Sequence, residues 1–262
     1  MLISHQYKFL FIGLPFSASS AIHHQLHEEF NAIPRLRKHS LYHEFFKSAN
    51  DKEKRYFVFA VLRNPMDIVI TNYEKMKANA KGNFTNPDFF TENGGHITRK
   101  QREKFHFIND KSVTFQDYFN KYFNKPYDNL ASLTTQYCDF LIRYESISTD
   151  YLEVLTQIGI KDALPLKVLN KTKGKRKIDI TAYYTDDIKK KAIFVFGPFM
   201  RKYNYAFPIF WGNVEISLFS RIYFKSLSLL MRINQKYFKS YKKKIDREGT
   251  VFGDIKNANK LS

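Results

Sequence analysis

Short apolar runs alternate with amphipathic stretches between residues 7 and 208. The runs have the length and apolar content of central parallel strands, and they are Phe9–Ile12, Tyr56–Leu62 and Asp139–Tyr144. Apolar residues recur at helical spacing after each run, so we expect helices from Ser19 or Ser20 through Phe30, over 66–76 and over 147–158. This alternation predicts an α/β fold, a three-layer sandwich with a central parallel sheet.

The C-terminal segment 211–262 has a different pattern. Apolar residues recur there every three or four positions with basic residues between them, at Ile216, Phe219, Tyr223, Leu227 and Leu230. The segment holds eleven Lys or Arg and four Asp or Glu. We therefore predict two parts, an α/β domain over 1–210 and a basic amphipathic helical extension over 211–262. Three roles for the extension stay open: a helix packed on the α/β body or in a homodimer, a peripheral membrane contact, and a flexible basic tail.

Two of the predicted strand-to-helix turns carry residues suited to phosphate. In the first, Leu14–Ser20, small residues allow backbone N–H groups to approach an anion and serine hydroxyls add donors. In the second, Arg63 ends a strand, Asn64-Pro65 turns the chain, and Thr71 follows on the helix. Arginine offers a planar fork of donors that matches phosphate. Each turn also has a plain structural interpretation: a serine helix cap in the first, and an Arg63–Asp67 ion pair in the second.

Charge narrows the class of partner. The chain carries 43 Lys or Arg against 25 Asp or Glu, a formal net charge of +18. This balance indicates an anionic partner, such as a polyanionic glycan, a nucleotide, a nucleic acid or an anionic membrane surface. The basic residues match no known nucleic-acid-binding module, so we expect no specific nucleic-acid partner.

The cysteine count and the N-terminal sequence bear on the compartment. Cys138 is the single cysteine, which excludes an intrachain disulfide and fits a reducing environment. The first residues enter a strand at once and leave no room for a signal peptide, and no window approaches the roughly 20 apolar residues of a membrane span. We expect a cytoplasmic protein.

Several segments together resemble one family. Arg63–Tyr73 reads Arg-Asn-Pro-x-Asp-x-x-x-Thr-x-Tyr. It is similar to the 3′-phosphate motif of the carbohydrate sulfotransferases that depend on PAPS (3′-phosphoadenosine 5′-phosphosulfate). Leu14–Ser20 resembles the 5′-phosphosulfate loop of that family, and Lys38-His39-Ser40 resembles a Lys-His pair of its bacterial members. Asp139–Tyr151 and Leu164–Thr185 resemble its later strand and cofactor lid, in the same order.

The resemblance covers about residues 7–208 and implies a P-loop-like sulfotransferase fold. It implies a bacterial-type soluble enzyme that moves a sulfuryl group from PAPS to a hydroxyl of a saccharide, in a polysaccharide, an oligosaccharide or a glycolipid, without a metal. The residues implied at the cofactor are Phe16, Ser17, Ala18, Ser19, Ser20, Arg63, Thr71 and Lys173. His39 is the predicted general base, with His43 and Glu44 as the alternatives.

One departure from the family pattern concerns Phe16, which stands where the family has a lysine beside the leaving 5′-phosphate. Candidates for a replacement cation are Lys38 and the lysines of a basic loop, Lys171, Lys173 and Lys175. Without such a cation, the alternative is a non-catalytic relative that binds a nucleotide or a glycan. Four basic residues, Arg99, Lys100, Arg102 and Lys104, are either a site for an acidic saccharide or a solvated face.

Overall fold

The computed structural model describes residues 1–161, 164–166, 179–238, 252–255 and 257. The chain forms two compact units. The first, here called the sheet unit, consists of Met1–Arg63, Asp128–Lys175 and Lys225–Ser262. The second, the helical unit, consists of Asn64–Tyr127 and Arg176–Phe224. The units are interleaved along the chain, and the predicted division after residue 210 stays a prediction.

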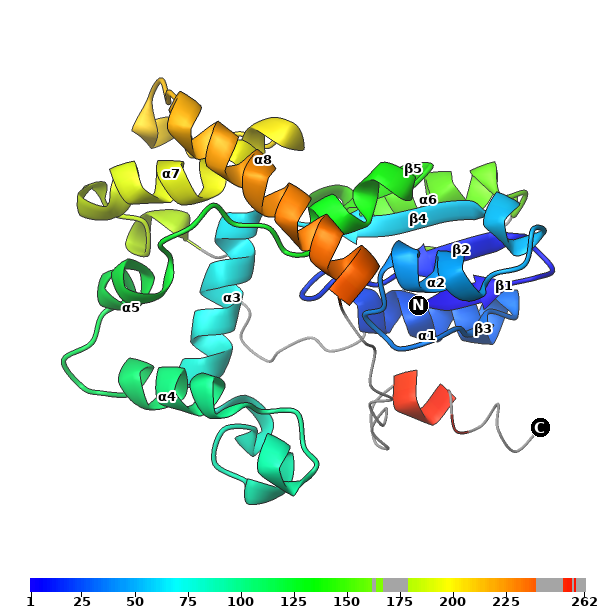
Figure 1. The fold of residues 1–262 in the computed structure, drawn as a ribbon, viewed down its shortest axis with the longest axis horizontal. Helices are drawn as coiled ribbons and strands as arrows, with labels where there is room; N and C mark the ends of the chain where they lie inside the picture. Colours follow the sequence, from blue (N-terminus) through cyan, green and yellow to red (C-terminus); the bar gives the residue numbers. More distant parts are fainter. Residues whose placement is uncertain (162–163, 167–178, 239–251, 256, 258–262) are drawn as a thin grey trace. The chain divides into compact units, whose positions relative to one another are not determined.

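The sheet unit contains a five-stranded mixed sheet in the order β3-β1-β2-β4-β5 (Figure 1). The strands are β1 Leu2–Ser4, β2 Phe9–Ile12, β3 Ile33–Pro34, β4 Phe57–Leu62 and β5 Phe140–Arg143. β2, β4 and β5 are parallel, as predicted, whereas β1 runs antiparallel to both β2 and β3. The predicted parallel arrangement thus holds for the three central strands, and the sheet as a whole is mixed. The four residues between β1 and β2 allow a hairpin and are too few for a parallel crossover.

Helices cover both faces of this sheet. β2 shows the alternation, because Phe9 and Phe11 point to one face and Leu10 and Ile12 to the other. The first face is covered by α1 (Ser19–Phe30) and α6 (Ile147–Gln157), and the second by α2 (Tyr42–Ser48). The predicted α/β layering is confirmed within the sheet unit. Because β2, β4 and β5 are parallel, their carboxyl ends lie along one edge of the sheet.

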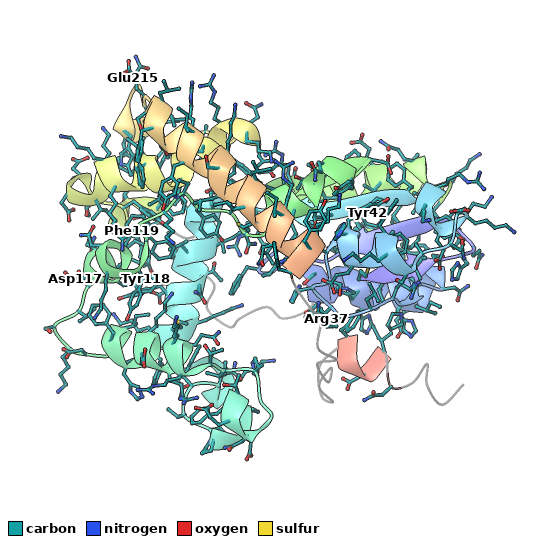
Figure 2. The ribbon with its side chains drawn as sticks, in the orientation of Figure 1. Arg37, Tyr42, Asp117, Tyr118, Phe119 and Glu215 are labelled. Carbon is teal, nitrogen blue, oxygen red and sulfur yellow. The ribbon has the colours of Figure 1, made fainter. Side chains whose placement is uncertain are left out.

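The helical unit is built around an aromatic core. Its helices are α3 Pro65–Lys77, α4 Arg99–Ile108, α5 Phe115–Tyr122 and α7 Asp186–Lys202. Tyr118 and Phe119 of α5 (Figure 2) are fully buried with Tyr184 and Phe196. The predicted Asn-Pro turn is confirmed, because the Asn64 side chain caps α3 by accepting from the Met66 N–H at 2.9 Å.

Short 3-10 turns connect these elements. They are Glu53–Arg55, Ala80–Gly82, Pro87–Phe89, Thr91–Asn93, Ala131–Leu133, Thr135–Tyr137, Tyr144–Ser146, Ile180–Ala182 and Ile209–Trp211. Gly159 follows α6 with a φ of 88°, the left-handed conformation expected of a glycine at a helix end.

The predicted C-terminal helix is confirmed as α8, Leu218–Ile233, which continues into the π-helical turn η10, Asn234–Phe238. Two of the apolar positions that predicted it, Phe219 and Leu230, are exposed, so the body of the protein does not cover the whole apolar pattern. Among the residues described above, no helix has both the length and the apolar character needed to cross a membrane.

Candidate functional site

The candidate site lies at the carboxyl ends of the three parallel strands of the sheet unit, where ligands bind in many open α/β sheets. The loop after β2 runs through Phe16, β4 is followed directly by Arg63, and β5 is followed by Tyr144. Arg63 is 5 % exposed. Its Nη1 donates to the Phe16 carbonyl at 3.3 Å, and its guanidinium carbon lies 4.3 Å from the centroid of the Tyr144 ring. One buried arginine therefore connects all three strand ends.

Side chains hold the loop after β2 by its carbonyl groups. Four consecutive carbonyls, those of residues 13 to 16, each accept a hydrogen bond from a side chain. The donors are His39 Nδ1 to Gly13 at 2.7 Å, Ser17 Oγ to Leu14 at 2.6 Å, Asn129 Nδ2 to Pro15 at 2.8 Å and Arg63 Nη1 to Phe16 at 3.3 Å. The conformation of this loop is therefore fixed by one donor of its own and by donors from three other segments of the chain.

The backbone of the loop has the geometry of an anion-binding nest. Phe16 and Ala18 have φ values of 62° and 52°, while Ser17 between them has a negative φ. Such alternation turns successive N–H groups toward one concavity. Left-handed φ at a non-glycine residue costs about 1–2 kcal/mol, so this shape is stored strain. Within the described part of the chain, the N–H groups of Ala18, Ser19 and Ser20 donate to no protein acceptor.

Lys38 and His39 reach the same loop from the segment after β3. The Lys38 ammonium donates to the Ser20 hydroxyl at 2.8 Å. His39 Nδ1 lies 2.7 Å from the Gly13 carbonyl oxygen, which can only accept, so Nδ1 carries the proton. The basic lone pair of the neutral ring is then on Nε2. The predicted base and one predicted replacement for the missing lysine thus lie at the two ends of the loop.

A buried histidine supports the loop from the sheet side. His23 of α1 is fully buried, and its Nδ1 donates to the Ser19 carbonyl. Its ring packs edge-on against Phe11 and Phe252, with centroids 5.1 Å away in each case. Burial lowers the pKa of His23 well below its usual value, and nearby positive charges act in the same direction. His23 is therefore a neutral residue in the folded protein.

Gly13 allows this close packing. A Cβ at Gly13 would meet the His23 ring at 2.8 Å and the Ser19 side chain at 3.0 Å. The residue at the end of β2 therefore has to be a glycine because the helix and its histidine approach the backbone so closely.

The structure places the other predicted residues as follows. Ser19 and Ser20 begin α1, but the predicted serine cap was wrong, because the N-cap position is Ala18 in a left-handed conformation that fits the nest. Thr71 lies on α3 of the helical unit and is half-buried, and its contact with a 3′-phosphate stays a prediction. Lys173, with Lys171 and Lys175, lies outside the described residues.

The two alternative bases have other partners or surroundings. The Glu44 carboxylate accepts from Arg37 at 2.5 Å, from the Ser40 hydroxyl at 3.0 Å and from the Leu41 N–H at 3.1 Å (Arg37 is labelled in Figure 2). It thereby fixes the turn that carries Lys38 and His39. Burial lowers the pKa of His43. Its buried Nε2 has no hydrogen-bond partner among the described residues, so no hydrogen bond joins this nitrogen to the loop after β2. His39 therefore stays the predicted base.

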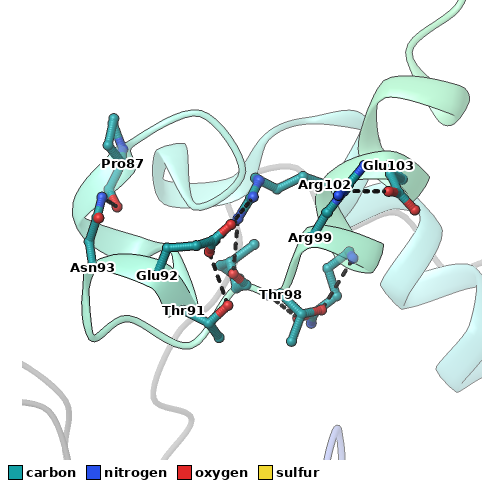
Figure 3. Close-up of polar contacts among 10 residues, drawn as sticks. Pro87, Thr91, Glu92, Asn93, Thr98, Arg99, Arg102 and Glu103 are labelled. Carbon is teal, nitrogen blue, oxygen red and sulfur yellow. Dashed lines mark hydrogen bonds and ion pairs between the residues drawn. The ribbon is translucent and has the colours of Figure 1, made fainter.

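The basic cluster predicted for an acidic saccharide is partly neutralised. Figure 3 shows Arg102 paired with Glu92, and Arg99 paired with Glu103 at 3.1 Å. The hydrogen bond from Arg102 lowers the pKa of Glu92 to about 2. Lys104 packs its ammonium 4.7 Å from the Tyr122 ring centroid, and burial lowers its pKa. Because two of its four basic side chains are paired with glutamates, this surface carries less positive charge for an acidic saccharide than the four basic residues alone would indicate.

The sequence did not predict the roles of three residues of the site, Asn129, Tyr144 and His23. Asn129 is far from the loop in sequence and belongs to no phosphate-binding pattern. Tyr144 lies in the Asp139–Tyr151 segment that resembles the family, but its contact with Arg63 was not predicted. His23 looks like any polar residue of an amphipathic helix. A weak signal for His23 was available, because it is one turn beyond Ser19, at the spacing that lets a side chain reach a helix carbonyl.

Compared with known protein families, with curated proteins and with solved structures, the chain matches none. Among the described residues, no three His, Cys, Asp or Glu side chains are grouped so that they could hold a metal ion.

Proposed function

We propose that this protein is a PAPS-dependent sulfotransferase that transfers a sulfuryl group to a hydroxyl of a saccharide. The observation that carries the proposal is the loop after β2, whose carbonyls 13 to 16 are all engaged by side chains and whose φ signs alternate. Such a loop at a helix N-terminus suits a phosphate or sulfate group. The mixed sheet, with three parallel strands and helices on both faces, supports a P-loop-like sulfotransferase fold.

The residues of the loop fit a 5′-phosphosulfate. The N–H groups of Ala18, Ser19 and Ser20 supply donors at the start of α1, and the serine hydroxyls add more. Bound PAPS supplies the sulfuryl group. Lys38, held at Ser20, places a positive charge beside the group that leaves. A preorganised charge of this kind accounts for roughly 10²–10³ in rate, so Lys38 offsets the loss of a lysine at Phe16.

His39 is the proposed base for the acceptor. Its Nε2 would accept the proton of the saccharide hydroxyl as the new oxygen–sulfur bond forms. The bond from sulfur to the 5′-phosphate oxygen then breaks and adenosine 3′,5′-bisphosphate leaves. The Gly13 carbonyl holds the ring in the tautomer needed for this. Arg63 has two proposed roles. It supports the loop through Phe16, and it binds the 3′-phosphate together with Thr71, as the family motif implies.

The test is calorimetric titration with adenosine 3′,5′-bisphosphate, followed by a sulfuryl-transfer assay with PAPS and a panel of oligosaccharides. We expect the bisphosphate to bind at least tenfold more tightly than adenosine 5′-monophosphate, because two phosphates are recognised. His39→Gln should keep nucleotide binding and lose roughly 10²–10⁴ of the transfer rate. Lys38→Met should lose roughly 10²–10³ of it, while Lys52→Met, at an exposed lysine elsewhere in the sheet unit, should lose none.

The outcomes separate the alternatives. Absence of bisphosphate binding would reject the proposed function. Tight binding without transfer from PAPS to any hydroxyl would favour the non-catalytic nucleotide-binding relative, which the Phe16 substitution makes the second candidate. Transfer that is insensitive to His39→Gln would keep the reaction and remove His39 as its base.

A further inference from the structure

One face of the C-terminal helix is unusually apolar for an exposed surface. Large apolar side chains are 39–68 % exposed along α8, at Leu218, Phe219, Ile222, Leu229, Leu230 and Ile233. At about 100° per residue they fall within an arc of roughly 120° on one side of the helix. Tyr237 and Phe238 of η10, also strongly exposed, extend the row. We call these eight residues the apolar face. Patches of this size on a single chain usually mark an interaction site.

The charge beside the apolar face is entirely positive. α8 and η10 contain four basic residues and no Asp or Glu, the basic ones being Arg221, Lys225, Arg232 and Lys236. By helical spacing, the three on α8 lie within roughly 60° of one edge of the apolar arc. The sequence from 239 to 248 adds five more Lys or Arg against two acidic residues. The partner of this face must therefore accept both apolar side chains and a row of cations.

A cavity of about 380 Å³ opens in the sheet unit at the end of this helix. Arg232 and Lys236 line it together with His43 and Tyr137, and its described lining contains no Asp or Glu. Arg232 makes two long hydrogen bonds: its Nε donates to the Ser228 carbonyl at 3.4 Å, and its Nη1 donates to the Gln136 side chain at 3.4 Å. The Nε2 of His43 is buried and has no partner among the described residues. The cavity thus has cationic and hydrogen-bonding groups suited to a small anionic group, beside apolar side chains that it shares with the face, Leu229 and Ile233.

We propose that the apolar face docks on an anionic lipid bilayer, with an acidic lipid head group in this cavity. A helix with a broad apolar arc and basic residues at its margin lies in the plane of a membrane interface, where both kinds of side chain are satisfied. Neighbouring Lys and Arg residues strengthen such binding to anionic lipid. A second copy of the chain is the less suitable occupant, because a two-fold contact would bring the same four cations against one another.

The test is co-sedimentation of the full chain with lipid vesicles. We expect binding to vesicles of phosphatidylcholine with 30 mol % phosphatidylglycerol (about one lipid in three), at least tenfold weaker binding to phosphatidylcholine alone, and weaker binding at higher salt. The double variant Leu230→Ser, Phe238→Ser should lose at least tenfold in the partition coefficient. Leu164→Ser, at a side chain that is 59 % exposed compared with 60 % for Leu230, is the matched control and should lose none.

A second pair of variants tests the cavity. Arg232→Gln with Lys236→Gln should lower binding to anionic vesicles by roughly twentyfold and leave binding to neutral vesicles unchanged, since each basic residue near the surface contributes roughly fivefold. Lys52→Gln is the control for removal of an exposed charge. Titration with adenosine 3′,5′-bisphosphate should give the same affinity for all these variants, so failure of vesicle binding and failure of the proposed enzymatic function are distinguishable.

Three results would overturn the inference. Equal binding to neutral and anionic vesicles would remove the charge argument. Absence of vesicle binding, with tight binding of glycerol phosphate, would assign the cavity to a free anionic compound. A dimer in analytical ultracentrifugation that Leu230→Ser, Phe238→Ser dissociates would assign the apolar face to a second copy of the chain.

Discussion

Replacing His23 tests whether the loop depends on a neutral buried imidazole. In the folded protein burial keeps the pKa of His23 well below 6.5, so the ring stays uncharged there. In the unfolded chain the same residue titrates near its ordinary value of about 6.5. Below that pH the unfolded chain takes up a proton that the folded protein does not. The free energy of unfolding therefore falls as the pH falls, and the contribution is fully present only above about pH 6.5.

The size of this effect follows from proton linkage. The largest possible effect is that of a ring that never charges in the folded protein, while the unfolded chain titrates at about 6.5. In that limit the ratio of all unfolded molecules to those with an uncharged His23 rises tenfold between pH 7.5 and pH 5.5. This corresponds to at most about 1.4 kcal/mol of unfolding free energy, compared with the roughly 5–15 kcal/mol of an ordinary domain. His43 shifts in the same direction, so the difference between wild type and a His23 variant, rather than the wild-type slope, measures His23 alone.

The assay is urea denaturation at pH 7.5, 6.5 and 5.5 for wild type and His23→Gln, which keeps a donor for the Ser19 carbonyl. The variant is expected to lose less unfolding free energy than wild type over this range, by up to about 1.4 kcal/mol. His106→Gln, at an exposed histidine, should keep the wild-type slope. Parallel curves for wild type and His23→Gln would refute the reasoning. If His23→Gln does not fold, an NMR titration of wild type replaces it, and a His23 ring that gains a proton above pH 5.5 would be equally decisive.

Two further predictions concern the loop. Gly13→Ala should lower the free energy of unfolding by about 1–3 kcal/mol in urea denaturation, because the new Cβ would lie 2.8 Å from the His23 ring. Gly82→Ala is the control: the position has open space around it, so this variant measures only the cost of a left-handed backbone. Phe16→Lys should raise PAPS turnover less than tenfold in the wild-type protein and should restore most of the activity lost in Lys38→Met, because one positive charge at the leaving group is enough. If the double variant folds and binds the bisphosphate but regains no activity, the proposed role of Lys38 is contradicted.

The layered α/β fold was predictable because its signal is local. β2, β4 and β5 are continuous apolar runs, and each is followed by a helix with a clear apolar stripe. The antiparallel strand β1 was not predictable by the same means. It has three residues, and they become a strand only because the chain turns back and pairs them with β2. Pairing of this kind is a tertiary property that a short segment does not encode.

The candidate site was predictable only in part. The pattern around Arg63 and the small residues of Leu14–Ser20 predicted two strand-to-helix turns suited to phosphate. In the structure Arg63 and Phe16, one from each turn, are in contact. The donors that shape the loop from outside could not be found, since Asn129 reaches Pro15 across 114 positions of sequence. The exposed apolar face of α8 was also beyond prediction, because periodicity shows that a helix has an apolar side without showing what covers it.

The geometry of the loop indicates how the proposed nucleotide site would work without a lysine at position 16. In a loop that a lysine helps to order, loss of that residue removes both charge and shape. Here the shape is maintained by hydrogen bonds to four carbonyls, so the strained φ values at Phe16 and Ala18 do not depend on a charged side chain in the loop. Charge then becomes a separate requirement that Lys38 can meet from another segment. Because Lys38 is adjacent to His39, one short turn, fixed by Glu44, positions both the proposed cation and the proposed base.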